Sequence, residues 1–189
     1  GDGVCIVGND TLFDNNWRRG GYGKMTIRQA FVQNSVVGNY KMAAKAFDGN
    51  MEEYFNKVRE IYSMTGDTTS LIVFANHGEW ATVTPMLTLA LVNKIAANTG
   101  NDSLKSALRY AVTDGLGMKA NTDKTEVAGI SGTIQQEEGS YMAEFCGYFP
   151  FKNPQYSIIV TIYKKDIPVS GGAMAGSVFK EIAEYLSNR

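Results

Sequence analysis

The chain has 189 residues, and its 18 lysines and arginines nearly balance its 19 aspartates and glutamates. This balance gives no electrostatic reason to expect a nucleic acid or an anionic membrane as a partner. The apolar runs are far shorter than the roughly 20 residues that span a bilayer, and the N-terminus shows no signal-peptide pattern. A hydrophobic content of 44% is enough for one substantial core, so we expect a single domain over residues 1–189.

The cysteines and the lone histidine argue against a metal site. Cys5 and Cys146 lie far apart and form no C-x-x-C pair, and His77 has no second histidine at ligand spacing. We therefore expect neither a metal nor another cofactor. Cys146 lies in an apolar run, which favours a small buried hydrophobe over a reactive thiol. A disulfide between the two cysteines stays open, and His77 is expected in a surface loop.

The first half of the chain has mostly helical signals. Residues 1–25 are rich in glycine and asparagine, which predicts loops with at most a short strand at Val4–Val7. Thr26 is placed to cap a helix, and the apolar spacing that follows predicts two short helices that meet near Asn34 and Ser35. A further amphipathic helix is predicted over residues 51–62.

The next helix start is sharper. Thr84 precedes Pro85, which is the pattern of a capping residue followed by proline at the first helical position. Helices are predicted over residues 86–97 and 103–113. The segment 26–114 is therefore the helical part of the chain.

Beyond residue 115 the apolar period changes from helical to alternating. Three antiparallel strands are predicted at 127–135, 142–149 and 156–163, joined by two tight connections. A last helix is predicted over 174–186, after the Gly171-Gly172 pair. These elements predict an α+β fold, in which a meander of three antiparallel strands packs with helices and the C-terminal helix covers the sheet.

Several sequence blocks resemble one known family in their order and residues. Gly23–Ala30 (GKMTIRQA) is similar to G-x-x-T-L-R-E-A, and Val83–Met86 (VTPM) to the start of V-T-P-L-Q. Val127–Gln135 (VAGISGTIQ) resembles A-G-K-T-G-T-A-Q, and Glu144–Pro150 (EFCGYFP) resembles F-V-G-Y-A-P. Two more blocks, Asn153–Tyr156 and the glycine pair before Val178–Ile182, continue the match to the C-terminus. The blocks together resemble the penicillin-binding proteins, which are serine transpeptidases that cross-link peptidoglycan.

That family needs three motifs for its chemistry: S-x-x-K for the nucleophile and its base, S-x-N, and K-T-G. We expect S-x-x-K to be missing, because Ser63–Gly66 ends in glycine and Ser103–Ser106 ends in serine. In the family this motif lies on a helix upstream of the middle motif.

The other two motifs are degenerate. Asn34-Ser35-Val36 stands where S-x-N belongs, and valine can neither donate nor accept the hydrogen bonds of asparagine. Ile130 replaces the lysine of K-T-G, whereas Ser131, Gly132 and Thr133 match. The lysine would supply a positive charge, and loss of one such group typically costs about 10² to 10³ in rate.

The resemblance therefore implies a transpeptidase-like domain without catalytic residues, which keeps a scaffold or peptide-binding role. It places substrate-binding positions at Ser35, Ser131, Gly132 and Thr133, with Asn34, Val36 and Ile130 as the degenerate positions. Ser35 as a latent nucleophile is the weaker interpretation, because the lysines of its helix lie on a solvated face.

The resemblance also implies partners and a location. Partners would be a peptidoglycan stem peptide or cell-wall proteins, with no nucleic acid and no metal. The location would be extracytoplasmic, on the periplasmic face, through a membrane anchor upstream of this chain.

Two alternatives stay open. The chain could be a fragment of an active peptidoglycan D,D-transpeptidase with S-x-x-K upstream, or an unrelated small binding module in which the motif matches are accidental. A structure without the terminal helix packed on a central strand at 127–135 would favour the binding module.

Overall fold

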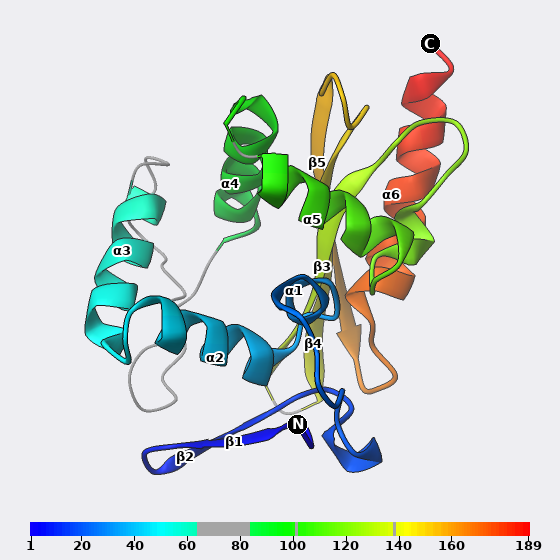
Figure 1. The fold of residues 1–189 in the computed structure, drawn as a ribbon. Helices are drawn as coiled ribbons and strands as arrows, with labels where there is room; N and C mark the ends of the chain where they lie inside the picture. The colour runs from blue at the N-terminus through cyan, green and yellow to red at the C-terminus, as the bar shows by residue number, and fades with distance from the viewer. Residues whose placement is uncertain (64–83, 101, 138) are drawn as a thin grey trace. The chain divides into compact units, whose positions relative to one another are not determined.

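The computed structural model describes residues 1–63, 84–100, 102–137 and 139–189 (Figure 1). They form two compact units, Gly1–Leu87 and Thr88–Arg189, and each is described by itself. His77 lies outside the described residues, so its place in a surface loop stays a prediction, as does the single domain over the whole chain. Among the helices of the described ranges, none is both long and apolar enough to cross a bilayer.

The first unit opens with a short hairpin. Strand β1 (Val4–Val7) pairs antiparallel with β2 (Asp10–Phe13), and Gly8 in the turn has a positive φ of 59°. The strand at Val4–Val7 was predicted, but its partner was not, because four residues that begin with aspartate and threonine carry no clear alternating signal. A single 3-10 turn, η1 (Trp17–Arg19), follows.

Three helices follow in the described part of the first unit, as the sequence predicts. They are α1 (Ile27–Val32), α2 (Val36–Ala46) and α3 (Met51–Ser63). At the start of α1, Gln29 N donates to Thr26 Oγ1 at 3.2 Å, and Thr26 N donates to Gln29 Oε1 at 2.8 Å. This reciprocal pair is a capping box, which satisfies two backbone donors that the first helical turn leaves unpaired.

Helix α4 (Pro85–Ala97) begins in the first unit and continues into the second. The hydroxyl of Thr84 accepts from Leu87 N at 3.2 Å, which confirms the predicted cap. Helix α5 (Asp102–Thr113) and the turn η2 (Met118–Ala120) then lead to the sheet.

The sheet of the second unit is the predicted meander. Strands β3 (Ala128–Glu137), β4 (Ser140–Phe149) and β5 (Tyr156–Lys165) pair antiparallel in the order β3-β4-β5. Helix α6 (Gly171–Ser187) packs against it, and Figure 1 shows α6 alongside these strands. The α+β class is confirmed. One expectation was wrong: β4 is the central strand, and β3, expected at the centre, is an edge strand of the described sheet.

The core of the second unit lies between α6 and the sheet. Phe145 of β4 and Phe179 of α6 meet edge to face, with ring centroids 4.8 Å apart, and both are fully buried. The surrounding buried side chains are small or aliphatic: Val112, Ala120, Val127, Ala175 and Ala183, with Phe149 beside them. The helical spacing of the apolar residues in α6 is therefore explained by one face packed on the strands.

Helix α6 begins earlier than predicted, at Gly171 and not at Met174. A Cβ on Gly171 would lie 2.0 Å from the Gly132 carbonyl oxygen, and one on Gly172 would lie 1.8 Å from that of Leu116. The sequence pattern placed the two glycines before the helix. They are instead in its first turn. Glycine is needed there because the helix backbone touches the strand backbone at Gly171 and the Leu116 backbone at Gly172.

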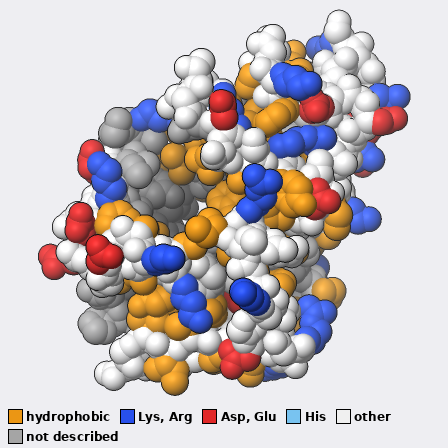
Figure 2. All heavy atoms as spheres, viewed as in Figure 1, with side chains coloured by type: hydrophobic (Ala, Val, Ile, Leu, Met, Phe, Trp, Pro, Cys, Tyr) orange, Lys and Arg blue, Asp and Glu red, His pale blue; other side chains and the backbone are white. Residues whose placement is uncertain are grey.

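Charged side chains of both signs are interspersed on the face of the molecule in Figure 2, separated by uncharged ones. This distribution agrees with the near-zero net charge of the sequence.

Candidate functional site

The predicted middle motif lies at the junction of α1 and α2. Asn34 is exposed and takes a left-handed conformation with φ 47°, which turns the chain between the helices. Ser35 then caps α2, because its hydroxyl oxygen accepts from Gly38 N at 2.8 Å. Ser35 is only 1% exposed, whereas Val36 is half-buried.

Sequence reasoning missed a buried carboxylate that holds this junction. Ser35 Oγ donates to Asp14 Oδ1 and Oδ2, at 2.9 and 3.0 Å, and Val37 N donates to Oδ1 at 3.1 Å. Asp14 is 3% exposed and follows β2, far from the helix in sequence. A negative group is favourable at a helix N-terminus, where backbone N–H groups point outward. The Ser35 hydroxyl therefore both caps α2 and binds Asp14.

The predicted third motif lies on β3 in the second unit. The side chains of a strand alternate between its two faces. Ser131 pairs across the strands with Phe145, so Ser131 and Thr133 lie on the face that packs against α6. Ile130 and Gly132 lie on the opposite face.

On the face of β3 that packs against α6, the third motif contacts the first turn of that helix. Thr133 Oγ1 accepts a hydrogen bond from Gly171 N at 3.0 Å. The Ser131 hydroxyl oxygen would lie 3.4 Å from a Cβ on Gly172. The two hydroxyls thus line the contact between β3 and the first turn of α6.

The opposite face carries a buried acid. Glu144 of β4 pairs across the strands with Gly132, is 9% exposed, and its Oε1 accepts from Thr161 Oγ1 at 3.1 Å. Burial raises the pKa of the Glu144 carboxyl above its ordinary value, and the Thr161 hydrogen bond opposes that shift. Its neighbour on the same face, Cys146, is a free, buried thiol. Burial, together with the nearby Glu144 charge, raises the pKa of Cys146 to about 12. The predicted buried role of Cys146 is confirmed.

Solved structures of known proteins share this arrangement of strands and helices. Over 89% of its length the chain resembles the transpeptidase domain of FtsI4 D,D-transpeptidase from Legionella pneumophila, with a TM-score of 0.58 and 21% identity, covering 80% of that chain. It also resembles, over its full length, the transpeptidase domain of penicillin-binding protein 3 from Burkholderia pseudomallei. That match has a TM-score of 0.70 and 19% identity, and covers 70% of that chain. The chain has the fold of a penicillin-binding-protein transpeptidase domain.

One sequence relative matches part of this transpeptidase-like domain. It is 30% identical over 104 residues to a peptidoglycan D,D-transpeptidase FtsI homolog from Mesostigma viride. That match covers 51% of the chain and 17% of the relative, so the chain spans only a small part of the relative's length. No known family profile matches. Helix α6 packs on the sheet, and the whole chain matches the fold of a transpeptidase domain, so the fold argues against the unrelated binding module.

The expectation that the transpeptidase-like domain contains no S-x-x-K is wrong. Ser177-Val178-Phe179-Lys180 has this pattern, on α6. Its last three residues belong to the block Val178–Ile182, which is matched to the terminal helix of the family. Ser177 Oγ donates to the Ala173 carbonyl oxygen at 2.6 Å, one turn back along the helix.

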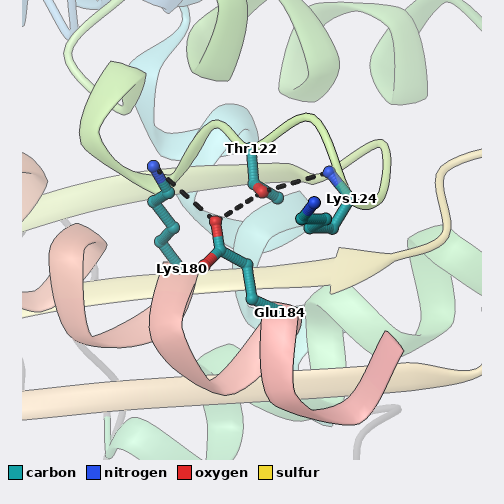
Figure 3. A network of polar contacts seen from close by, with 4 residues as sticks. All are labelled: Thr122, Lys124, Lys180 and Glu184. Atoms are coloured by element: carbon teal, nitrogen blue, oxygen red, sulfur yellow. Dashed lines mark hydrogen bonds and ion pairs between the residues drawn. The ribbon is translucent and has the colours of Figure 1, made fainter. Parts of the chain in front are cut away.

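The lysine of this pattern, Lys180, forms an ion pair with Glu184. Lys180 Nζ lies 3.7 Å from Glu184 Oε1, which also accepts from Thr122 Oγ1 at 2.6 Å, and Figure 3 shows this network around Glu184. No hydrogen bond joins the two described residues Ser177 and Lys180, so the pattern has the spacing of a nucleophile and base without their contact.

The predicted site residues thus fall into two groups in two separately described units. Asn34, Ser35 and Val36 belong to the first unit, and residues 130–133 belong to the second. Their roles in substrate binding stay predictions.

Proposed function

We propose that this transpeptidase-like domain is catalytically silent and serves in the cell wall as a scaffold that binds an extended peptide. The observation that carries the proposal is Ile130, which stands on β3 where the K-T-G motif has its lysine. An isoleucine offers no charge to a substrate carboxylate and no proton to a transfer network. Loss of one preorganised group of this kind costs about 10² to 10³ in rate.

Two further features of the motif positions support catalytic silence. Val36 cannot make the hydrogen bonds of the asparagine in S-x-N. The S-x-x-K pattern on α6 pairs Lys180 with Glu184 and leaves Ser177 bonded to its own helix, so neither group activates the other. Losses in groups that act together are not additive, but each removes a step that the family's chemistry requires.

Peptide binding is supported by the position of β3. As an edge strand of the described sheet, it has backbone groups on its outer side that are not paired with β4. An extended peptide can add to such an edge through main-chain hydrogen bonds. Arg109 Nη1 donates to the Val127 carbonyl oxygen at 2.7 Å and fixes the chain just before the strand. The partner would be a peptidoglycan stem peptide or a segment of a cell-wall protein, which places the domain outside the cytoplasm.

The proposal is tested with a fluorescent penicillin and with stem peptides. The folded chain should give no covalent fluorescent band, whereas an active transpeptidase labelled beside it should give one. Soluble peptidoglycan stem peptides should bind the chain reversibly. Covalent labelling would contradict catalytic silence, and absence of any stem-peptide or cell-wall-protein binding would contradict the binding role.

A second candidate is a part of an active peptidoglycan D,D-transpeptidase. The match to the Mesostigma viride relative covers only 17% of that relative, which favours a chain that is one part of a longer enzyme. In that case S-x-x-K would lie in a segment of the parent protein outside this chain. The parent open reading frame decides between the candidates: an upstream S-x-x-K favours the active enzyme, and a parent without it favours the silent domain.

A further inference from the structure

The sheet face opposite α6 places a buried carboxylate beside an open position. Glu144 and Gly132 are directly paired across β3 and β4, so a side chain at 132 would project next to Glu144. A Cβ on Gly132 would meet no heavy atom within 4 Å. The open position at Gly132 is therefore directly paired with the residue that bears this carboxylate, although Glu144 itself is only 9% exposed.

The partners of this carboxylate within the protein are few. Its one hydrogen bond in the described structure comes from the Thr161 hydroxyl, a neutral donor, at 3.1 Å. None of the ion pairs among the described residues includes Glu144. Burial of a carboxylate without a cation is unfavourable, because neutral donors replace only part of its hydration. A positively charged group in the open space at Gly132 would restore the missing partner.

This face carries an acidic side chain, Glu144, whereas the K-T-G motif of the transpeptidases has a positively charged lysine. Ile130, at the lysine position, lies on the same face as Gly132 and Glu144. A lysine there would have drawn a carboxylate, whereas isoleucine beside a buried glutamate favours a cation. A bare divalent metal fits poorly, because it needs several oxygen ligands, and the described residues contain no group of three or more acidic, histidine or cysteine side chains that could hold one.

We propose that this face binds the protonated amine of an extended peptide, with Glu144 accepting its hydrogen bond and Gly132 leaving the space it enters. The inference rests on the proposed peptide-binding function and names the chemistry of the ligand. A lysine side chain or a free N-terminal amine is a compact cation with several donors, which matches one carboxylate beside a narrow opening. Ile130 and the stem of the amine would form the apolar wall of the contact.

The test compares two sets of short capped peptides, pooled, that contain one lysine among alanine, valine and threonine. One set has free lysine amines, and the matched set has acetylated ones. The folded chain should bind the free-amine set at least about tenfold more tightly, which is the effect of one charge-assisted hydrogen bond. The variant Glu144→Gln should bind both sets equally. Glu181→Gln, which removes an exposed charge from α6, should keep the preference.

A second variant keeps the test decisive if Glu144→Gln fails to fold. Gly132→Ala adds a methyl group where the structure has room, so it should fold and should lose most of the preference. Equal binding of the two sets by the unmodified chain would overturn amine recognition and leave peptide binding intact. Binding of neither set, and of no stem peptide, would overturn both. A preference that persists in both variants would overturn the assignment to Glu144.

Discussion

Ser35 and Asp14 are joined by two short contacts, 2.9 and 3.0 Å, although they are 21 residues apart in sequence and both are almost fully buried. The contact ties the segment after β2 to the first turn of α2, where Val37 N adds a third hydrogen bond to the same carboxylate. The middle-motif residues Asn34 and Val36 flank this anchored serine. The conformation of the degenerate motif therefore depends on a residue outside it.

Asp14→Ala should destabilise the fold by about 2 to 3 kcal/mol, because it leaves the Ser35 hydroxyl and the Val37 N–H buried without their acceptor. Denaturant unfolding measures the change. Asp2→Ala removes an exposed carboxylate from the same unit, whose Oδ1 accepts from Val4 N at 3.2 Å, and it should cost less than about 1 kcal/mol. In the double variant with Ser35→Ala, the two losses should be clearly less than additive. Strict additivity would mean that the two side chains do not act together.

Gly171→Ala should destabilise the second unit by about 3 kcal/mol or more, because the new Cβ would lie 2.0 Å from the Gly132 carbonyl oxygen and α6 would have to move. Gly132→Ala, on the strand β3 that α6 contacts, provides the control. Its Cβ meets nothing within 4 Å, so its effect should stay below about 1 kcal/mol. Equal effects in thermal or denaturant unfolding would contradict the close approach of α6 to β3.

Cys146 should resist alkylation in the folded chain at pH 8. Burial raises the pKa of its thiol to about 12, so almost none of the reactive thiolate is present, and the thiol is also 2% exposed. Cys5 is partly exposed and should react first with iodoacetamide. Peptide mass spectrometry before and after addition of denaturant measures both positions. Equal modification of the two cysteines in the native chain would contradict the burial of Cys146.

Glu144→Gln should change how stability depends on pH. The pKa of the Glu144 carboxyl is raised in the folded state, so folding favours its protonated form. Its contribution to stability is therefore fully present at low pH and is lost as the pH rises through the folded-state pKa. Relative to the unmodified chain, the variant should gain stability as the pH rises from about 4 to 7. Unfolding curves across this range that stay parallel would contradict the raised pKa.

The periodic parts of the fold could be predicted from the sequence. The helices capped by Thr26 and Thr84 and the three-stranded meander all have local signals, namely a cap, an apolar period or a turn. The start of α6 could not, because Gly171 is required by a carbonyl oxygen of another strand, and no local pattern records that contact. Strand β2 could not be predicted either, because its extended conformation depends more on pairing with β1 than on its own residues.

The candidate site was predicted less completely. The resemblance to the family's motifs predicts Ile130 and Val36 as degenerate positions, and these assignments stay predictions. Asp14 and Glu144 were missed because their importance comes from burial beside Ser35 and Gly132, which only the fold brings about. The pattern at Ser177–Lys180 is visible in the sequence, but its place on the terminal helix hid it. The structure then assigns its two side chains to helix and surface contacts.

Catalytic silence is tested most directly by intact-protein mass spectrometry of the folded chain after prolonged incubation with excess penicillin. Every serine that the motifs single out, at positions 35, 131 and 177, is present in this chain, so any nucleophile among them would gain the mass of the opened β-lactam. We predict an unchanged mass. A penicilloyl adduct that peptide mapping places on Ser35, Ser131 or Ser177 would contradict the account.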